Sequence, residues 1–387
     1  MVKVMAVFGT RPEAIKVAPV VRALRQHADE FETVVCVTAQ HREMLDQVLQ
    51  HFEIVPEYDL NIMQPRQSLS QILTRALAGL AEAIADAKPD IVLVHGDTAT
   101  TFAGSLAAFY ARVKVGHIEA GLRSFDKWFP YPEEVYRRLT GVVADIHFAP
   151  TAVSRANLLR EGVSADSIFV TGNSVIDALL WTVRQDYRFS DERLNAIDFA
   201  GRKVVLVEAH RRENWGQPMR DIAAALRDLV TSLPEIELIV SAHLNPEAGA
   251  VQRAALEDLP RVHIFDPFTY PEWCNLMARA HLIISDSGGL QEEAPALGVP
   301  VLVCRDVTER PEAVEAGTVK LVGTDRERIV REATRLIRDE AAHRAMARAA
   351  NPYGDGRTSE RIVQALRHYF GLRPDRPADY CPQPALR

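Results

Sequence analysis

The chain has 387 residues, 47% of them hydrophobic and 25% charged, which is typical of a globular protein. At about 150 residues per domain, this length predicts two domains. With 45 Lys and Arg residues against 52 Asp and Glu residues, the formal net charge is −7, and no basic block indicates nucleic-acid binding. No apolar run approaches the roughly 20 residues of a membrane span, and no secretory signal is evident, so we expect a cytoplasmic protein that binds neither nucleic acid nor membrane.

Short apolar runs typical of buried strands alternate with longer helical patterns along the chain. In the first half we predict strands over residues 4–8, 33–38, 91–95, 114–119, 146–149 and 168–171. In the second half we predict strands over residues 203–208, 237–241, 262–265, 282–285, 299–303 and 318–321. Helical patterns lie between them, over residues 14–26, 42–52, 68–87, 218–232, 271–280 and 326–338. This alternation predicts an α/β fold with a parallel sheet in each half.

A polar segment over residues 181–202 interrupts the alternation. We therefore predict an N-terminal Rossmann-like domain over residues 1–180 and a second one over residues 201–355. The last residues, 372–387, are rich in Pro and Arg and are expected to form a loosely attached tail. Ligands of open α/β sheets bind beyond the carboxyl ends of the strands, so we expect a functional site in a cleft between the two domains.

Charged residues follow the predicted strands of the first half. Arg11 lies in a turn that leads from strand 4–8 into a helix, where it either holds an anion or lies on the surface of a capped helix. Asp97 follows strand 91–95 and is either a reactive carboxylate or a helix cap. These positions make the first half the candidate source of acid and base groups.

Two further acidic positions extend this pattern. Glu119 ends the next predicted strand and is either a catalytic carboxylate or a structural partner of Arg123. Glu133 and Arg137 are four residues apart, so we expect them to meet on one face of a helix.

The second half carries groups suited to phosphate. His210 and Arg211 follow strand 203–208, and His243 follows strand 237–241. Ser287-Gly288-Gly289 opens a helix after strand 282–285, and free backbone N–H groups at such a position favour a phosphate. The sequence therefore predicts that the second half holds a nucleotide diphosphate and that the first half supplies acids and bases.

Other ligand classes lack their signatures. There is no GxGxxG after the first strand and no Walker A motif, so neither a nicotinamide cofactor nor a P-loop is indicated. The four cysteines are widely scattered and form no CxxC pair or zinc spacing. We expect reduced thiols, no metal and no cofactor.

Nine ordered motifs together resemble the family of non-hydrolysing UDP-N-acetylglucosamine 2-epimerases, from residue 1 to about residue 370. The motifs are FGTRPEAIK, TAQHR, HGDT, HIEAGLRS, PYPEE, HRRENWG, SDSGGLQEEAPALGVPVLV, TERPE and NPYGDG. The resemblance implies a GT-B-like fold in which a helix over residues 356–371 crosses back to the first domain. It also implies interconversion of UDP-N-acetylglucosamine and UDP-N-acetylmannosamine, with UDP eliminated to a 2-acetamidoglucal and then re-added. Members commonly form homodimers and supply N-acetylmannosamine units for cell-surface polysaccharides.

The resemblance also implies roles for individual residues. Those matching the catalytic groups are Asp97, Glu119, Glu133 and His210. Those matching ligands of UDP and the substrate are Arg11, Lys16, Arg137, Arg211, Trp273, Ser287, Gly288, Gly289, Glu293 and Arg310. Those matching a regulatory UDP-N-acetylglucosamine site are Gln40, Arg66 and His243, together with Arg211.

The chain departs from the family pattern at Tyr136 and Glu208, where an Asn and a Thr are usual, and at Glu43, where some members carry a Gln. We expect these changes to tune the substrate or its regulation. Two alternative functions stay open at this point: a hydrolysing 2-epimerase that releases free N-acetylmannosamine, and a GT-B glycosyltransferase.

Overall fold

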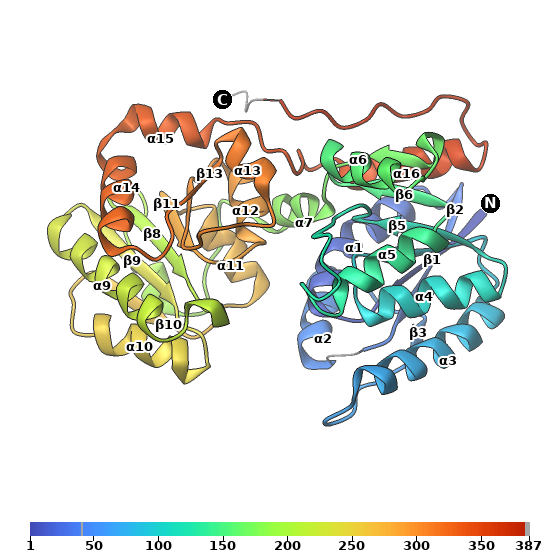
Figure 1. The fold of residues 1–387 in the computed structure, drawn as a ribbon, viewed down its shortest axis with the longest axis horizontal. Helices are drawn as coiled ribbons and strands as arrows, with labels where there is room; N and C mark the ends of the chain where they lie inside the picture. Colours follow the sequence, from blue (N-terminus) through green and yellow to red (C-terminus); the bar gives the residue numbers. More distant parts are fainter. Residues whose placement is uncertain (40–41, 384–387) are drawn as a thin grey trace. The chain divides into compact units, whose positions relative to one another are not determined.

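The computed structural model describes residues 1–39 and 42–383, which divide into two compact units. Unit 1 comprises Met1–Ala178 and Tyr353–Cys381, and unit 2 is built mainly from Leu179–Pro352. Each unit contains one parallel sheet flanked by helices (Figure 1). The predicted α/β fold with two Rossmann-like sheets is therefore confirmed.

The sheet of unit 1 has seven parallel strands in the order β3-β2-β1-β4-β5-β6-β7. The strands are β1 Val2–Phe8, β2 Phe31–Val37, β3 Tyr58–Asp59, β4 Ile91–His95, β5 Lys114–Ile118, β6 Ile146–Ala149 and β7 Ile168–Val170. The helices are α1 Arg11–Arg25, α2 Arg42–His51, α3 Leu69–Ala87, α4 Ala99–Tyr110, α5 Glu133–Val143, α6 Ala152–Arg160, α7 Ser174–Thr182 and α16 Thr358–Tyr369. Helix α7 runs across the boundary into unit 2.

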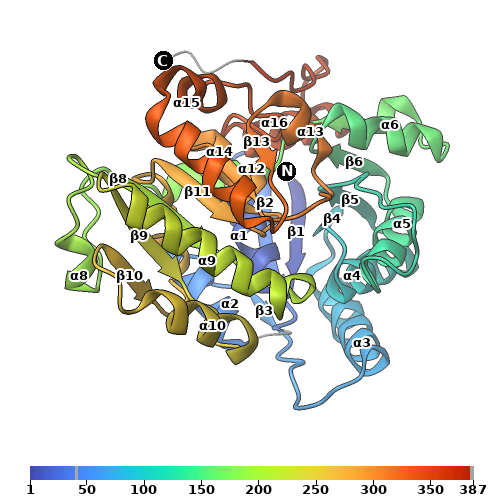
Figure 2. The ribbon, with the colours of Figure 1, turned by 60° about the vertical axis from the view of Figure 1, so that its left-hand side comes forward.

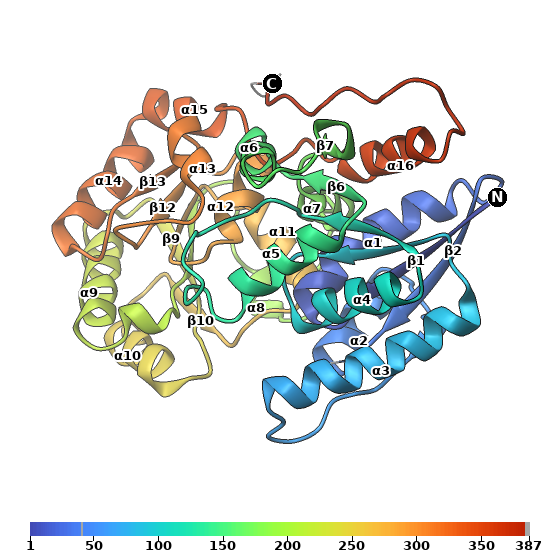
Figure 3. The ribbon, with the colours of Figure 1, turned by 45° about the vertical axis from the view of Figure 1, so that its right-hand side comes forward.

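Apolar side chains cover both faces of this sheet. Side chains of α3 and α4 pack on one face, and these two helices lie side by side in Figure 3. Side chains of α1 and α16 pack on the other face. The strands therefore read as continuous apolar runs, because each is buried on both sides.

The sheet of unit 2 has six parallel strands in the order β10-β9-β8-β11-β12-β13. The strands are β8 Lys203–Glu208, β9 Ile236–Ser241, β10 Val262–Phe265, β11 Leu282–Ser285, β12 Val301–Val303 and β13 Val319–Leu321. The helices are α8 Glu192–Asn195, α9 Gln217–Ser232, α10 Pro246–Leu256, α11 Tyr270–Met277, α12 Leu290–Glu293, α13 Pro311–Ala316, α14 Arg326–Arg338 and α15 Glu340–Ala347. Figure 2 shows α9 beside α14, and both pack on the main apolar core of this unit.

The chain returns to unit 1 at Tyr353. Helix α16 then packs against α1 and contributes Ile362, Val363 and Leu366 to the core of that unit. Among the helices of the described residues, none is both long and apolar enough to cross a membrane.

Candidate active site

Three neighbouring strands of unit 1 bring their carboxyl ends together. Strand β1 pairs with β4, and β4 pairs with β5, all in parallel register. The first turn of α1, after β1, carries Arg11, and the turns after β4 and β5 carry Asp97 and Glu119. The sheet topology therefore places these three positions at one edge, as the strand pattern predicts.

Glu119 is a buried carboxylate that pairs with a lysine. Its backbone has a φ of +63°, a left-handed conformation that costs free energy for a residue with a Cβ. Its side chain is 8% exposed, forms an ion pair with Lys16 Nζ, and accepts a hydrogen bond of 2.7 Å from Asn173 Nδ2. The ring of His95 lies 3.9 Å from the same oxygen, and burial lowers the pKa of His95 to about 4, so this ring is neutral at pH 7.

Arg123 is not the partner of Glu119. Its guanidinium instead makes two parallel hydrogen bonds, of 2.9 and 2.7 Å, to the Glu161 carboxylate. This alternative from the sequence is therefore wrong, and the counter-charge comes from Lys16, which is 103 positions away in the chain. The Lys16 side chain is itself 16% exposed, so the ion pair is largely shielded from water.

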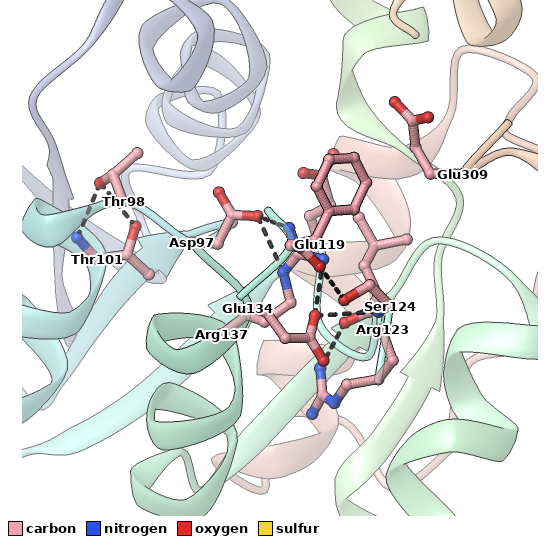
Figure 4. Close-up of polar contacts among 12 residues, drawn as sticks. Asp97, Thr98, Thr101, Glu119, Arg123, Ser124, Glu134, Arg137 and Glu309 are labelled. Atoms are coloured by element: carbon pink, nitrogen blue, oxygen red, sulfur yellow. Dashed lines mark hydrogen bonds and ion pairs between the residues drawn. The ribbon is translucent and has the colours of Figure 1, made fainter. Parts of the chain in front are cut away.

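Asp97 is held by Arg137 of α5. The Arg137 Nε donates to Asp97 Oδ2 at 3.0 Å, and Nη2 forms a closer contact to the same oxygen. The remaining amino group, Nη1, donates at 3.2 Å to Glu134, which is fully buried (Figure 4). One guanidinium therefore joins two carboxylates.

The predicted meeting of Glu133 with Arg137 is wrong, because Arg137 contacts Glu134 instead, at a spacing of three residues. Within the described residues the Glu133 carboxylate, which is half-buried, has no hydrogen-bond or ion-pair partner. The ring of Tyr136, one of the departures from the family pattern, stacks on Phe102 of α4 with centroids 5.7 Å apart. This stacking accommodates the larger side chain.

Glu13 ties the first two turns to each other. It is buried at the start of α1 and accepts hydrogen bonds from Thr10 N at 2.9 Å and Thr10 Oγ1 at 2.8 Å. Its other oxygen accepts from Thr98 Oγ1 at 2.7 Å and Thr101 Oγ1 at 3.1 Å, at the start of α4. The turn that carries Arg11 and the turn that carries Asp97 are thus fixed by one carboxylate.

In unit 2, Asp286 holds the segment that carries His210 and Arg211. This fully buried carboxylate accepts hydrogen bonds from His210 N at 3.0 Å, Arg211 N at 2.9 Å and Asn214 Nδ2 at 2.9 Å. Burial lowers the pKa of His210, against the opposing effect of Asp286. The His210 ring stacks on His243 with centroids 5.4 Å apart, so the structure brings these two predicted site residues together.

The predicted phosphate cradle of unit 2 is lined by arginines. A Cβ added at Gly288 would lie 2.9 Å from Glu309 Oε1 and 3.3 Å from Arg211 Nη2. Arg211 Nη2 contacts Glu309 at 3.1 Å, and Arg310 Nη1 approaches the same carboxylate at 3.5 Å. Arg305 Nη1 holds the other oxygen at 2.6 Å.

The Glu309 carboxylate is therefore an anion seated against Gly288 among three guanidinium groups. Burial alone would raise its pKa, but Arg310, Arg305 and Arg211 together with a backbone N–H lower the pKa to about 2. The carboxylate is fully ionised at neutral pH, and the same position suits a phosphate oxygen.

The remaining predicted residues lie on separate elements. Trp273, on α11, is half-buried and stacks on Phe268 with centroids 6.0 Å apart. A Cβ added at Gly289 would lie 3.4 Å from Glu293 Oε2, so this carboxylate borders the same turn. Arg66 is exposed in unit 1. Gln40 lies outside the described residues, and the Glu43 side chain is not among the described ones.

Sequence reasoning did not single out five residues that hold the site: Glu13, Glu134, Asn173, Asp286 and Glu309. Three of these stand beside predicted residues, since Glu134 follows Glu133, Asp286 precedes the glycine turn and Glu309 precedes Arg310. For Glu13, Glu134 and Asp286 the available signal was an acidic residue at a strand end or in the first turn of a helix, which local rules interpret as a cap.

Three potential metal ligands, His27, Asp29 and Glu30, lie after α1 with ligand atoms within 4.8 Å of one another. The Glu30 carboxylate is already engaged by Arg367 Nε of α16 at 2.7 Å and approached by Arg373 at 3.7 Å. Its charge is therefore used to hold α16 against the turn after α1.

Comparisons with known proteins agree on one family. The family model described as UDP-N-acetylglucosamine 2-epimerase matches residues 22–367. The UDP-N-acetylglucosamine 2-epimerase of Escherichia coli K12 is 55% identical over 373 residues, which cover 95% of this chain and 98% of that protein. A crystal structure of the Neisseria meningitidis UDP-GlcNAc 2-epimerase bound to UDP-GlcNAc is 49% identical, covers 94% of this chain and 99% of that chain, and has a TM-score of 0.84. A sucrose-phosphate synthase from Thermosynechococcus elongatus, 15% identical with a TM-score of 0.62 over 96% of this chain and 100% of that chain, shares the fold alone.

Proposed function

We propose that this chain, which belongs to the UDP-N-acetylglucosamine 2-epimerase family, interconverts UDP-N-acetylglucosamine and UDP-N-acetylmannosamine without releasing free sugar. The family membership carries the 2-epimerase activity, and the geometry of unit 1 supports the way in which it proceeds. The observation that carries the mechanism is a pair of carboxylates at neighbouring strand ends, Asp97 and Glu119, which pair with different cations.

The chemistry at C2 requires more than one acid or base. The C2 proton is not adjacent to a carbonyl group, so it becomes removable only as the C1–O bond to UDP breaks. A base takes the proton, the C–H electron pair forms the C1=C2 double bond, and UDP departs with the C1–O electron pair. A proton then returns to C2 from the opposite face, and a UDP oxygen re-forms the bond to C1.

Unit 1 has carboxylates in different environments that could serve the two faces of C2 in this proposal. Glu119 is buried beside Lys16, while Asp97 is 24% exposed and bonded to Arg137. Carboxylates whose surroundings differ can hold different protonation states at the same pH, which is how enzymes assign acid and base roles. Glu133, without a described partner, completes the proposed set.

Unit 2 has the groups for the leaving UDP. We assign the diphosphate to Arg211, Arg310 and the turn Ser287-Gly288-Gly289, where Glu309 marks the position of an anion. His210 assists departure of UDP beside the phosphates.

Four more residues complete the substrate ligands in this proposal. Glu293 binds the ribose, Trp273 lies beside the uracil ring, and Arg11 and Lys16 of unit 1 serve the sugar and its phosphates. We further propose a homodimer whose product supplies N-acetylmannosamine for surface polysaccharide.

A regulatory UDP-N-acetylglucosamine site is proposed at Arg66, His243 and Gln40. The stacking of His243 on His210 supports it, because an occupant that moves one ring displaces the other.

The decisive experiment is proton NMR of the protein with UDP-N-acetylglucosamine in D₂O, without added metal or nicotinamide. We expect a mixture with UDP-N-acetylmannosamine that carries deuterium at C2. Accumulation of UDP and free N-acetylmannosamine would select the hydrolysing reaction instead. Unchanged substrate, with transfer only after an acceptor is added, would select a glycosyltransferase.

The Asp97→Asn variant tests the acid/base role. We expect UDP affinity near that of the wild type, because Arg211, Arg310 and the glycine turn proposed to hold the diphosphate lie in unit 2, and turnover lower by several powers of ten. Full turnover in this variant would contradict the assignment.

A further inference from the structure

Glu134 is a fully buried carboxylate with three donors from two segments of unit 1. Its Oε2 accepts from the backbone N–H of Ser124 at 3.0 Å and from Arg137 Nη1 at 3.2 Å. Its Oε1 accepts from the backbone N–H of Phe125 at 3.2 Å. Figure 4 shows this carboxylate between the Ser124 loop and the Arg137 side chain.

We propose that Glu134 is a positioning residue for the epimerase reaction, acting through Arg137 on Asp97 and through residues 124–125 on the segment that follows Glu119. It does not itself touch the substrate in this proposal. The inference rests on the proposed function for its catalytic consequence, while its structural consequence can be measured separately.

The loop contact has a clear physical reason. Phe125 has a φ of +62°, a conformation that costs about 1 kcal/mol or more for a residue with a Cβ and persists only where its surroundings fix it. Glu134 supplies that fixation by accepting the N–H of Phe125 itself. Ser124 Oγ closes the same loop with a hydrogen bond to the carbonyl oxygen of Phe129.

The Arg137 contact sets the direction of a shared cation. The guanidinium is planar, so fixing Nη1 on Glu134 fixes the plane in which Nε and Nη2 meet Asp97. The Arg137 side chain is only 13% exposed, so little water is present to replace a lost partner. Without Glu134, we expect the guanidinium to turn and the Asp97 carboxylate to move with it.

The Glu134→Gln variant tests the proposal with minimal change of shape. A Gln side chain presents one oxygen and one NH₂ group, so at least one of the three donors faces another donor. We expect kcat to fall about 10- to 100-fold, since a displacement near 1 Å can cost that much, while UDP affinity stays unchanged. Glu57→Gln is the matched control, because Glu57 also joins a backbone N–H (Val35, 2.6 Å) to an arginine (Arg25, 3.2 Å).

A double-mutant cycle separates positioning from general destabilisation. If Glu134 acts through Arg137, Glu134→Gln should lower kcat much less in an Arg137→Met background than in the wild type. A merely structural role would lower kcat by the same factor in both backgrounds. That result would overturn the proposal that Glu134 acts through Arg137. Unfolding curves of all four proteins exclude global unfolding as the cause.

Amide hydrogen exchange tests the proposed effect of Glu134 on residues 124–125, and this measurement does not depend on enzyme activity. In Glu134→Gln the peptide over residues 121–132 should exchange faster than in the wild type, and in Glu57→Gln it should not. Unchanged exchange in Glu134→Gln would overturn the proposed effect on residues 124–125, whether or not the wild type epimerises. A wild type that lacks epimerase activity but shows the expected exchange difference would refute the proposed function alone.

Discussion

The ion pair between Lys16 and Glu119 yields a quantitative prediction for the Lys16→Met variant. Both side chains are largely buried, so removing the cation leaves a carboxylate in a site that no longer compensates its charge. The hydrogen bond from Asn173 Nδ2 remains, but a neutral amide replaces only part of the lost interaction. Methionine fills most of the volume of the lysine stem, so the lost packing is small.

The penalty has an upper limit that depends on pH. The carboxyl group escapes an uncompensated charge by taking up a proton, which costs about 1.4 kcal/mol for each pH unit above the usual Glu pKa of about 4.3. The charge penalty therefore cannot exceed about 3.7 kcal/mol at pH 7 or about 1 kcal/mol at pH 5. Because the variant raises the folded-state pKa of this carboxyl, the destabilisation grows as the pH rises through this range.

Urea denaturation at pH 5 and pH 7, monitored by hydrogen exchange of unit 1 peptides, measures the loss of stability at each pH. We expect Lys16→Met to lose more stability at pH 7 than at pH 5, and Lys16→Met with Glu119→Gln to regain most of the loss. The matched control is Lys114→Met, because Lys114 pairs with Asp145 at 2.9 Å but is 53% exposed and should contribute at most about 1 kcal/mol. Equal losses at the two pH values would refute the reasoning.

Two further predictions concern the Glu309 carboxylate and two buried histidine rings. Glu309→Gln should bind UDP about tenfold more tightly by calorimetry, because the carboxylate that occupies the position beside Gly288 loses its charge; weaker binding would contradict an anion site there. Burial lowers the pKa of His95 to about 4 and that of His117 to about 3, so the unfolded chain binds protons first as the pH falls below about 6.5. Each ring should then reduce the stability of unit 1 by up to about 1.4 kcal/mol per pH unit between pH 6.5 and its folded pKa. In the same denaturation assay, His95→Gln should therefore lose less stability between pH 7 and pH 5 than the wild type.

The strands could be predicted because each is an apolar run buried on both faces. The prediction over residues 203–208 matches β8, and that over residues 91–95 matches β4. Strand β3 was not predicted, because the two residues Tyr58 and Asp59 carry no periodicity. It exists through its pairing with Cys36 and Val37 of β2, a tertiary contact that no local pattern records.

The positions of the site residues could be predicted better than their partners. Asp97 and Glu119 follow neighbouring strands, and parallel pairing alone brings them to one edge. Their cations come from elsewhere, and only the folded chain specifies them. Residues four apart in a helix lie on one face, so Arg137 was predicted to meet Glu133. The buried side of α5 carries Glu134 instead, and the arginine pairs with that residue.

The arrangement of cations in unit 1 explains why these carboxylates can differ in function. Lys16 serves Glu119, whereas Arg137 is divided between Asp97 and Glu134. A buried carboxylate paired with a lysine responds to different forces from one that shares an arginine with a second carboxylate and meets water. In the proposed reaction, reprotonation at C2 on the face opposite to deprotonation requires two separate groups. Lys16 on α1 and Arg137 on α5 are separate cations on separate helices, which suits two groups that act on opposite faces of C2.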